Sequence, residues 1–212
     1  TYSFTKADFG FTDADSPANN FTAVKITTLP GGSLTLGGNP VTAGQVIPVT
    51  SGPAGSSWTA TSFTNRDGLT SELSDNGQVA VVGFWTGQVS VSIDGGTNWT
   101  SPAALTGITA TGIALSSNGS KIYLSTRNSQ LWVSSDSGTN WTAVESTRFW
   151  DAVACSSDGS KAIACAGSGQ VYLTTDGGTN WLGVTIPGAI QLGSVASSAN
   201  GVKLVASDRN TG

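Results

Sequence analysis

Short runs of alternating apolar and small residues, separated by turn residues, characterise most of the chain. Apolar positions alternate ahead of Asn118-Gly119 and Asp158-Gly159, and short apolar runs follow both pairs. Asn-Gly and Asp-Gly between apolar runs are strong hairpin signals, because both residues tolerate positive φ angles. They predict second strands at 79–82, 121–124, 161–164 and 203–206, and third strands at 88–91, 130–133 and 170–173. No segment has useful helical periodicity, so the pattern predicts an all-β chain.

Two sequence marks repeat along the chain with nearly the same period. An eight-residue mark ends at Trp99, Trp141 and Trp181, spaced by 42 and 40 residues, and a degenerate copy ends at Trp58. A turn mark ends at glycines spaced by 42, 40 and 42 residues, namely Gly77, Gly119, Gly159 and Gly201. Four strands within about 41 residues form the unit of a β-propeller blade. We therefore expect four repeats over residues 57–212, the last incomplete, and favour a piece of a longer propeller over a four-bladed ring.

The eight-residue marks, at 92–99, 134–141 and 174–181, resemble the Asp-box (BNR) repeats of β-propellers. That pattern is usually written Ser-x-Asp-x-Gly-x-Thr-Trp, and this chain departs from it by carrying Asn98, Asn140 and Asn180 before the tryptophan. We expect each aspartate to accept backbone N–H groups of its own turn, each glycine to adopt positive φ, and each tryptophan to be largely buried. These structural residues are Asp94, Gly96, Trp99, Asp136, Gly138, Trp141, Asp176, Gly178 and Trp181.

The N-terminal segment, residues 1–49, lacks both marks. Alternating apolar residues at 21–26 and 29–36 predict strands with one buried face. With the runs 8–15 and 41–47, they resemble the first half of the cadherin-like, Ig-type sandwich repeats of large bacterial surface and adhesion proteins. The resemblance implies a small Ig-like β segment, followed by a linker at 50–56. Half a sandwich buries little surface alone, so we expect the propeller or strands of another chain to cover it.

Composition narrows the classes of function. The chain has 9 Lys and Arg against 13 Asp and Glu, a net charge of −4, which makes nucleic acid a poor partner. Histidine is absent, which excludes His-dependent catalytic triads and His-ligated metal sites. The longest purely aliphatic run, at 79–82, is too short to span a membrane.

No cofactor is expected apart from calcium. Asp13 and Asp15 form an acidic pair of the kind that helps to bind Ca²⁺ in surface repeats. Two carboxylates are too few for a cation that takes six to eight oxygen ligands. A solvated turn is therefore the favoured interpretation of this pair, with a calcium site as the alternative.

Three loop residues, Trp85, Arg148 and Trp150, are the candidate ligand-binding residues. Exposed aromatic side chains beside polar groups can stack on a sugar ring, but packing between blades is the favoured interpretation. Asp-box propellers include sialidases, which need an arginine cluster and acid/base carboxylates. Arg127, Arg148 and Arg209 lie in loops that could share a face, yet we favour scattered, solvated positions for them. The Phe-Arg-Ile-Pro motif of sialidases is absent from the sequence, and we expect no enzyme.

The two cysteines, Cys155 and Cys165, are ten residues apart on neighbouring predicted strands. We favour two small buried thiols; a hairpin disulfide in an oxidising compartment is the alternative.

The sequence thus predicts a non-catalytic structural or adhesive component of an extracellular or cell-surface assembly. Low charge, abundant Ser, Thr and Gly, and the resemblance to surface repeats carry this expectation. The expected partners are other protein subunits, including further copies of this chain, which bind by β-strand pairing. Glycans are the other expected partners. The alternatives are a carbohydrate-binding propeller and a fragment of an Asp-box glycosidase.

Overall fold

The computed structural model describes residues 67–189 and 191–209, together with the backbone of four short strands nearer the N-terminus. The chain divides into two compact units, Thr1–Ala60 and Thr61–Gly212. In the first unit, β1 (Ala23–Lys25) pairs with β4 (Val46–Pro48), and β2 (Thr35–Leu36) pairs with β3 (Asn39–Pro40), both antiparallel. Asp13, Asp15 and Trp58 lie outside the described residues.

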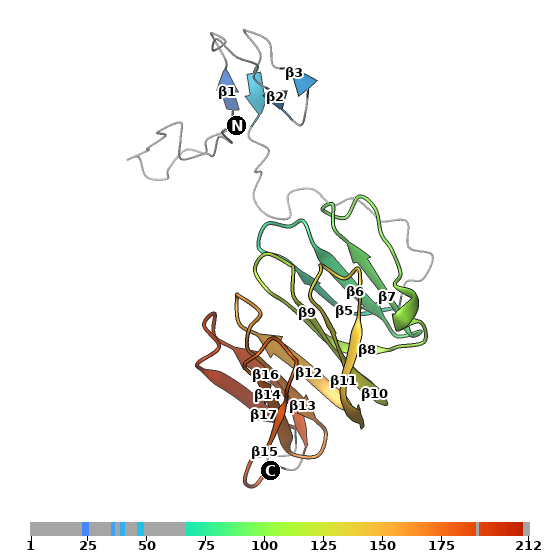
Figure 1. Cartoon of the computed structure of the whole chain (residues 1–212), viewed down its shortest axis with the longest axis vertical. Helices are drawn as coiled ribbons and strands as arrows, with labels where there is room; N and C mark the ends of the chain where they lie inside the picture. The colour runs from blue at the N-terminus through green and yellow to red at the C-terminus, as the bar shows by residue number, and fades with distance from the viewer. Residues whose placement is uncertain are drawn as a thin grey trace. The chain divides into compact units, whose positions relative to one another are not determined.

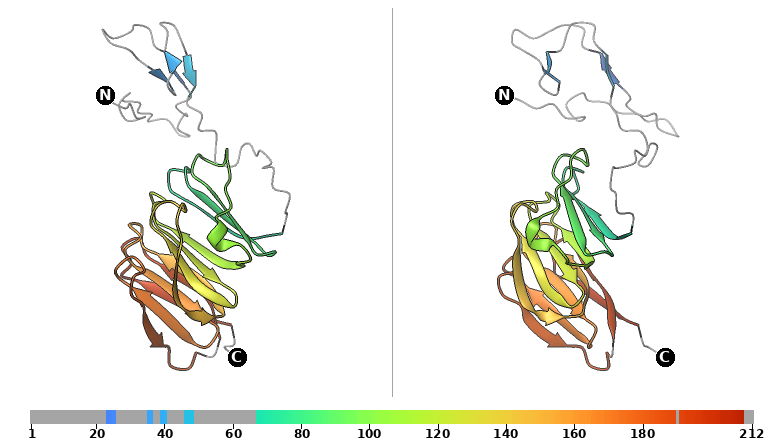
Figure 2. Two further views of the ribbon diagram at one scale, coloured as in Figure 1. Left: turned by 45° about the vertical axis from the view of Figure 1, so that its right-hand side comes forward. Right: turned by 90° about the vertical axis from the view of Figure 1, so that its right-hand side faces the viewer.

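The described residues of the second unit form four antiparallel sheets, numbered here 1 to 4 in chain order (Figures 1 and 2). Sheet 1 contains β5 (Gly68–Leu73), β6 (Ala80–Phe84) and β7 (Gln88–Ser92). Sheet 2 contains β8 (Ala110–Leu115), β9 (Ile122–Thr126), β10 (Ser129–Ser134) and β11 (Thr142–Arg148). Sheet 3 contains β12 (Trp150–Cys155), β13 (Ala162–Ala166), β14 (Gln170–Thr174) and β15 (Leu182–Thr185). Sheet 4 contains β16 (Leu192–Ser197) and β17 (Leu204–Asp208).

Each sheet is a meander in which consecutive strands pair, and successive sheets lie side by side (Figure 1). The predicted second and third strands are present, with bounds that differ by one or two residues from the sequence pattern. The first strands of neighbouring sheets, β5, β8, β12 and β16, are adjacent. This arrangement places the strand that opens each repeat against the repeats before and after it.

The turns that follow the first strands join the sheets by backbone hydrogen bonds. The N–H of Asp75 donates to the carbonyl of Ser117 (2.9 Å), that of Ser117 to Ser157 (2.7 Å), and that of Ser157 to Ala199 (2.7 Å). These residues hold the same place in the repeated turn mark of each sheet. The repeat period seen in the sequence is therefore the distance along the chain from one inter-sheet bond to the next.

Sheet 1 lacks the fourth strand that the repeat predicts. A single isolated bridge joins Val91 to Thr100, and one turn of 3-10 helix, Ala103–Leu105, follows soon after. Pro102 stands between them and has no N–H group to donate to a strand ladder. Pairing with β7 therefore stops after one residue pair, and the prediction of a fourth strand is wrong for this repeat.

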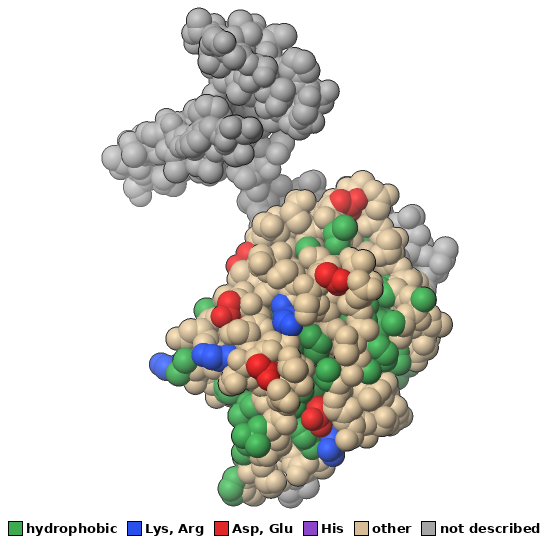
Figure 3. Space-filling model, in the orientation of Figure 1, with side chains coloured by type: hydrophobic (Ala, Val, Ile, Leu, Met, Phe, Trp, Pro, Cys, Tyr) green, Lys and Arg blue, Asp and Glu red, His purple; other side chains and the backbone are tan. Residues whose placement is uncertain are grey.

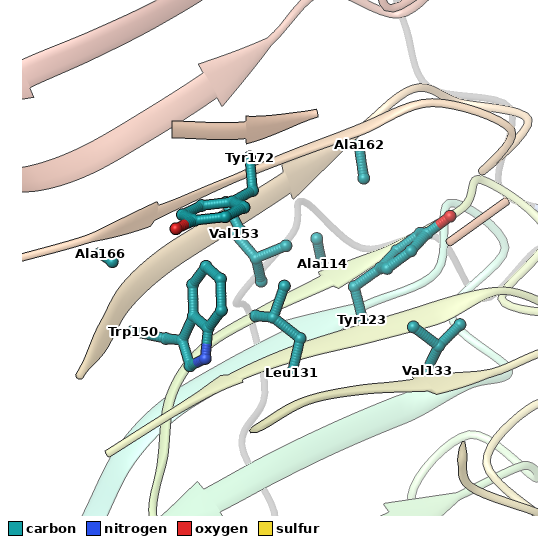
Figure 4. Close-up of a cluster of buried hydrophobic side chains, with 10 residues drawn as sticks. Ala114, Tyr123, Leu131, Val133, Trp150, Val153, Ala162, Ala166 and Tyr172 are labelled. Carbon is teal, nitrogen blue, oxygen red and sulfur yellow. The ribbon is translucent and has the colours of Figure 1, made fainter. Parts of the chain in front are cut away.

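Buried side chains from sheets 2 and 3 form a common core, shown in Figure 4. Trp150 is 0% exposed and packs edge-on against Tyr172, with ring centroids 4.8 Å apart. At the other end of the cluster, the hydroxyl of Tyr123 donates to the carbonyl of Gly159 at 2.8 Å. Burial raises the pKa of Tyr123, so its hydroxyl remains a donor at all ordinary pH values.

Both cysteines are free thiols, as the sequence favoured. They lie on the paired strands β12 and β13 but not opposite each other, since Cys155 faces Ala162 and Cys165 faces Ala152. Burial raises the pKa of Cys155 to about 12 and that of Cys165 to about 11. Both thiols therefore stay protonated near neutral pH and act as small apolar side chains.

In the part of the chain that the structure describes, we find no helix with the length and hydrophobicity needed to cross a bilayer.

Two equivalent turn glycines allow a test of how closely the sheets approach. Gly77 and Gly119 both have positive φ, 71° and 72°, but a Cβ at Gly119 would lie 2.6 Å from Val79, whereas one at Gly77 meets no described atom within 4 Å. Gly77→Ala should lower the free energy of unfolding by about 1 kcal/mol through backbone strain alone. Gly119→Ala should lower it by about 3 kcal/mol, because overpacking adds to the same strain. Urea unfolding followed by circular dichroism measures both, and equal costs would contradict the close approach of sheets 1 and 2.

Candidate functional site

The second unit has two ends with different chemistry. In each meander, the turns after the first and third strands lie at one end. This end carries the turns at 92–99, 134–141 and 174–181, which we call the Asp-box turns after the sequence pattern that they resemble, and we call it the Asp-box end. The turns after the second strands and the connections between sheets lie at the other end, called here the loop end. The hydrogen bonds from Asp75 through Ser117 and Ser157 to Ala199 show that the four sheets are aligned in the same sense.

The three Asp-box turns have nearly identical hydrogen bonds. In the second turn, Oδ1 of Asp136 accepts the backbone N–H of Asn140 at 2.8 Å, and Oδ2 accepts the side-chain amide of Asn140 at 2.7 Å. The hydroxyl of Ser134 donates to Asp136 and accepts the N–H of Gly138, both at 2.9 Å. The expected aspartate–backbone bonds are thus present, and the bonds of Asp94 and Asp176 repeat them.

The asparagine of each turn has a role that the sequence pattern did not reveal. Asn98, Asn140 and Asn180 stand where the family pattern has Thr or Ser, and each donates its side-chain amide to the second carboxylate oxygen at 2.7 Å. A hydroxyl is shorter and carries a single donor. Each asparagine therefore donates two hydrogen bonds to its aspartate, one from the backbone and one from the side chain.

The tryptophans of these turns, Trp99, Trp141 and Trp181, are mostly covered and partly exposed, as expected. The indole N–H of Trp99, Trp141 and Trp181 donates to the carbonyl of the turn glycine at 3.0, 2.8 and 3.1 Å. This bond holds each ring over its own turn. The buried edge of Trp181 meets Tyr123 of the preceding sheet, with centroids 6.0 Å apart.

At the loop end, an arginine lies between two exposed aromatic rings. The guanidinium of Arg127 is 4.8 Å from the ring centroid of Trp85 and 4.6 Å from that of Phe149. Trp85 is 52% exposed and Phe149 is 39% exposed. Cation–π contact holds the three side chains as one platform, which we call the Arg127 platform. Of the candidate ligand-binding residues, Trp85 alone keeps an exposed ring.

Trp150 is not available to a ligand. It is fully buried in the core of sheets 2 and 3, which agrees with packing between blades and corrects its place among candidate binding residues. Arg148 is partly buried, with its guanidinium 4.8 Å from the ring centroid of Tyr172 and 5.9 Å from that of Trp150. Arg148 therefore closes the core at the loop end.

The third loop arginine, Arg209, forms an ion pair with Asp151 at 3.0 Å. The Asp151 side chain is 5% exposed, and burial raises its pKa against the opposing effect of Arg209 and Arg127. Because Arg127, Arg148 and Arg209 all lie at the loop end around Phe149 and Asp151, the expectation that these arginines are scattered is wrong, although Arg127 and Arg209 remain exposed to solvent. The sequence held a sign that two of these arginines lie at the same end. The spacings of 42, 40 and 42 residues place at equivalent positions of the repeats Trp85, Arg127, Gly167 and Arg209.

The face of the second unit drawn in Figure 3 has no large patch of a single charge. On the face drawn in Figure 3, basic and acidic side chains both occur and are separated by uncharged surface. Within residues 67–189 and 191–209 there is no group of three or more carboxylates and cysteines able to hold a metal ion. The proposed calcium pair, Asp13 and Asp15, lies outside these residues.

Comparison with known proteins supports the fold and nothing finer. No family model and no curated protein matches the sequence. The chain is similar to an ancestral GH74 enzyme, with a TM-score of 0.57 and 18% identity over 69% of this chain and 22% of that one. It is also similar to the WD40 repeats of RRP9 (TM-score 0.54, 8% identity, 63% of this chain, 42% of that one). A third match is YCF48 from Cyanidioschyzon merolae (TM-score 0.51, 19% identity, 67% of this chain, 50% of that one).

This chain thus spans half or less of the length of these three proteins. At such low identity the likeness shows the fold alone, and the fold is that of β-propeller blades, all-β with four-stranded antiparallel sheets.

The Asp-box turns should make stability depend on acid. Hydrogen bonds from the backbone and side chain of Asn180, and from Thr174, lower the pKa of Asp176 from 3.8 to about 2. A carboxyl group with a lowered folded-state pKa stabilises the fold above pH 4 and loses that contribution as the pH falls towards 2. Asp176→Asn should therefore flatten the fall of unfolding free energy across this interval. The control is Asp75→Asn, an exposed aspartate outside these turns; identical acid profiles for both variants and the native chain would exclude this linkage.

Proposed function

We propose that this chain is a non-catalytic structural or adhesive component of an extracellular or cell-surface assembly, joined to neighbouring subunits by β-strand pairing along β17. The observation that carries the proposal is the exposure of this strand. Low charge and abundant Ser, Thr and Gly in the sequence support the extracellular setting.

Strand β17 is much less buried than the second strands of sheets 2 and 3. Every residue of β9 and β13 is buried. Val205 holds the position of Tyr123 and Ile163 in the repeat, yet it is 66% exposed, against 1% and 3% for those two. Within the described residues, β17 pairs only with β16. None of the described strands pairs with its outer edge, and a strand edge of this kind can recruit another strand.

The occupant we propose for this edge is a second copy of the chain. The opposite end of the array, strand β5, also presents apolar side chains, with Leu69 40% and Leu73 54% exposed. The described residues thus expose apolar side chains on two different strands, β5 and β17, and a head-to-tail contact between identical subunits needs two such different surfaces.

The contacts of the three arginines at the loop end support a non-catalytic role. Arg127 and Arg148 contact aromatic rings of the chain itself, and Arg209 is paired with Asp151. A sialidase-like mechanism needs such arginines turned towards a substrate carboxylate. Here their charges are engaged in holding the loops together.

Strand pairing predicts self-association that a single charge abolishes. Size-exclusion chromatography with light scattering should give the native chain a mass above that of its 21.3 kDa monomer. Val205→Lys should return the mass to the monomer, because lysine on an edge strand opposes pairing. Its exposure predicts that the variant folds normally.

The matched control is Val202→Lys. Val202 is 69% exposed but lies in the turn before β17. Its substitution adds the same charge and should leave the mass unchanged. A well-folded native monomer at all concentrations, or equal effects of both substitutions, rejects pairing along β17.

Carbohydrate binding is a second candidate, supported by the Arg127 platform. Two partly exposed rings on either side of a guanidinium combine apolar faces with hydrogen-bond donors, which suits a sugar ring with its hydroxyl groups.

A glycan array tests this second function. Trp85→Ala should remove binding of the native chain to its preferred glycans. Ile93→Ala, which removes another exposed apolar side chain (62% exposed) at the Asp-box end, should not. An array with no bound glycan, or with binding that survives Trp85→Ala, counts against the platform.

A further inference from the structure

Neighbouring sheets of the second unit meet through the same two faces at every joint. We call the face that a sheet turns towards the next sheet in chain order its forward face, and the opposite face its rear face. On the forward face of sheet 2, Tyr123 packs with Val153 and Ala164 of sheet 3. On the forward face of sheet 3, Ile163 packs with Val195 of sheet 4. The array of sheets therefore has a direction, and its two end faces are of different kinds.

Both end faces are open among the described residues. On the forward face of sheet 4, Val205 holds the position of Tyr123 and Ile163, and it is 66% exposed. The rear face of sheet 1 has a hollow of about 360 Å³, whose lining includes Ser71, Leu73, Ala80 and Val82. The equivalent residues of sheet 2 belong to the core shared with sheet 1, and they are Ile113, Leu115, Ile122 and Leu124. The hollow thus lies where a preceding sheet would place its forward side chain.

The turn glycines show the same unfilled positions at both ends. A Cβ added to such a glycine would lie 2.6 to 2.8 Å from the residue just before the second strand of the preceding sheet, in the pairs Gly119 with Val79, Gly159 with Lys121 and Gly201 with Lys161. Gly77, the first glycine of the series, meets no described atom within 4 Å. Lys203 is the last residue of the other series, and it is exposed. The described residues therefore provide no preceding side chain for Gly77 and no following glycine for Lys203.

The chain of turn bonds ends in a free donor and a free acceptor. The N–H of Asp75 donates to sheet 2, but no described N–H donates to the Asp75 carbonyl. The carbonyl of Ala199 accepts the N–H of Ser157, but the N–H of Ala199 has no acceptor among the described residues. The two ends are therefore complementary at the one backbone position that joins every pair of sheets.

The end turns also differ in charge. Asp75 is the only acidic residue at this position of the repeat, which in the other sheets is occupied by Ser117, Ser157 and Ala199. Nζ of Lys161 donates to the carbonyl of Asn200 in the turn of the following sheet, at 2.9 Å. Lys203 placed over Gly77 in the same manner would bring its ammonium group to the turn that carries Asp75. Opposite charges at such places favour contact between the two ends.

We propose that the forward face of sheet 4 stacks on the rear face of sheet 1 of a second copy of this chain, with Val205 in the hollow beside Leu73. Lys203 then lies at the turn of Asp75, and the N–H of Ala199 donates to the Asp75 carbonyl. A second copy is the occupant because each feature of one end has its counterpart at the other. The proposal rests on the self-association proposed above, but it assigns the contact to the faces of the end sheets instead of the outer edge of β17.

Exchange of two charges tests the contact on the full chain. Sedimentation equilibrium gives the Kd of self-association for the native chain, Lys203→Asp, Asp75→Lys and the double variant. Each single change should weaken association about tenfold, because it brings like charges together. The double variant restores opposite charges and should return to within about threefold of the native Kd. Both residues are exposed, and circular dichroism checks that each variant is folded.

A substitution in the hollow tests the apolar part of the contact. Leu73 is 54% exposed, and Leu73→Lys should weaken association about tenfold by placing a charge where Val205 packs. The matched control is Ile93→Lys, at a residue that is 62% exposed in the first Asp-box turn. This control adds the same charge outside both end faces and should associate like the native chain.

Two results overturn the stacking while self-association stands. One is a Kd that Leu73→Lys leaves unchanged, and the other is a double variant that associates no better than Lys203→Asp and Asp75→Lys. If Val205→Lys still abolishes association in either case, strand pairing along β17 is retained and the end faces are excluded. A native chain that stays monomeric overturns both proposals.

Discussion

The second unit depends on the burial of the second strands of its two inner sheets, β9 and β13, between neighbouring sheets. A meander of four strands has two faces, and a single sheet cannot remove both from water. Strands β9 and β13 are buried throughout because sheets pack on either side of them. Each such contact removes apolar area at about 25 cal/mol per Å², and close packing at turn glycines such as Gly119 lets the sheets approach. The sheets are therefore stable as a stack rather than one by one.

Much of the strand and turn structure of these sheets could be predicted from the sequence, because the same turn motifs recur in each repeat. The turn marks placed the hairpins, and the Asp-box pattern placed the aspartate–backbone bonds of Asp94, Asp136 and Asp176. The missing fourth strand of sheet 1 was not foreseen, although Pro102 stands where pairing stops. A repeat predicts what its copies share, and a single residue that breaks the ladder is easily overlooked.

The candidate site was harder to predict, because it forms between repeats. The sequence placed Trp150 in a loop, but it is the first residue of strand β12. Whether its ring faces water or the next sheet depends on how two sheets pack, and it is buried against Tyr172. The gathering of Arg127, Phe149 and Asp151 likewise joins residues of different sheets. The spacing in the sequence showed only that equivalent positions of the repeats are occupied by Trp85, Arg127, Gly167 and Arg209. Their location at the same end of the second unit follows from the alignment of the sheets.

The chain of turn bonds from Asp75 through Ser117 and Ser157 to Ala199 links each sheet only to its neighbours. Cooperativity in such an array is one-dimensional, so opening begins at an end and advances sheet by sheet. Amide protons of β17 should exchange with solvent soonest and those of β9 and β13 last, because the latter strands open only when two joints are lost. A partner that covers an end sheet would therefore slow exchange throughout the array, and stability itself would report on assembly.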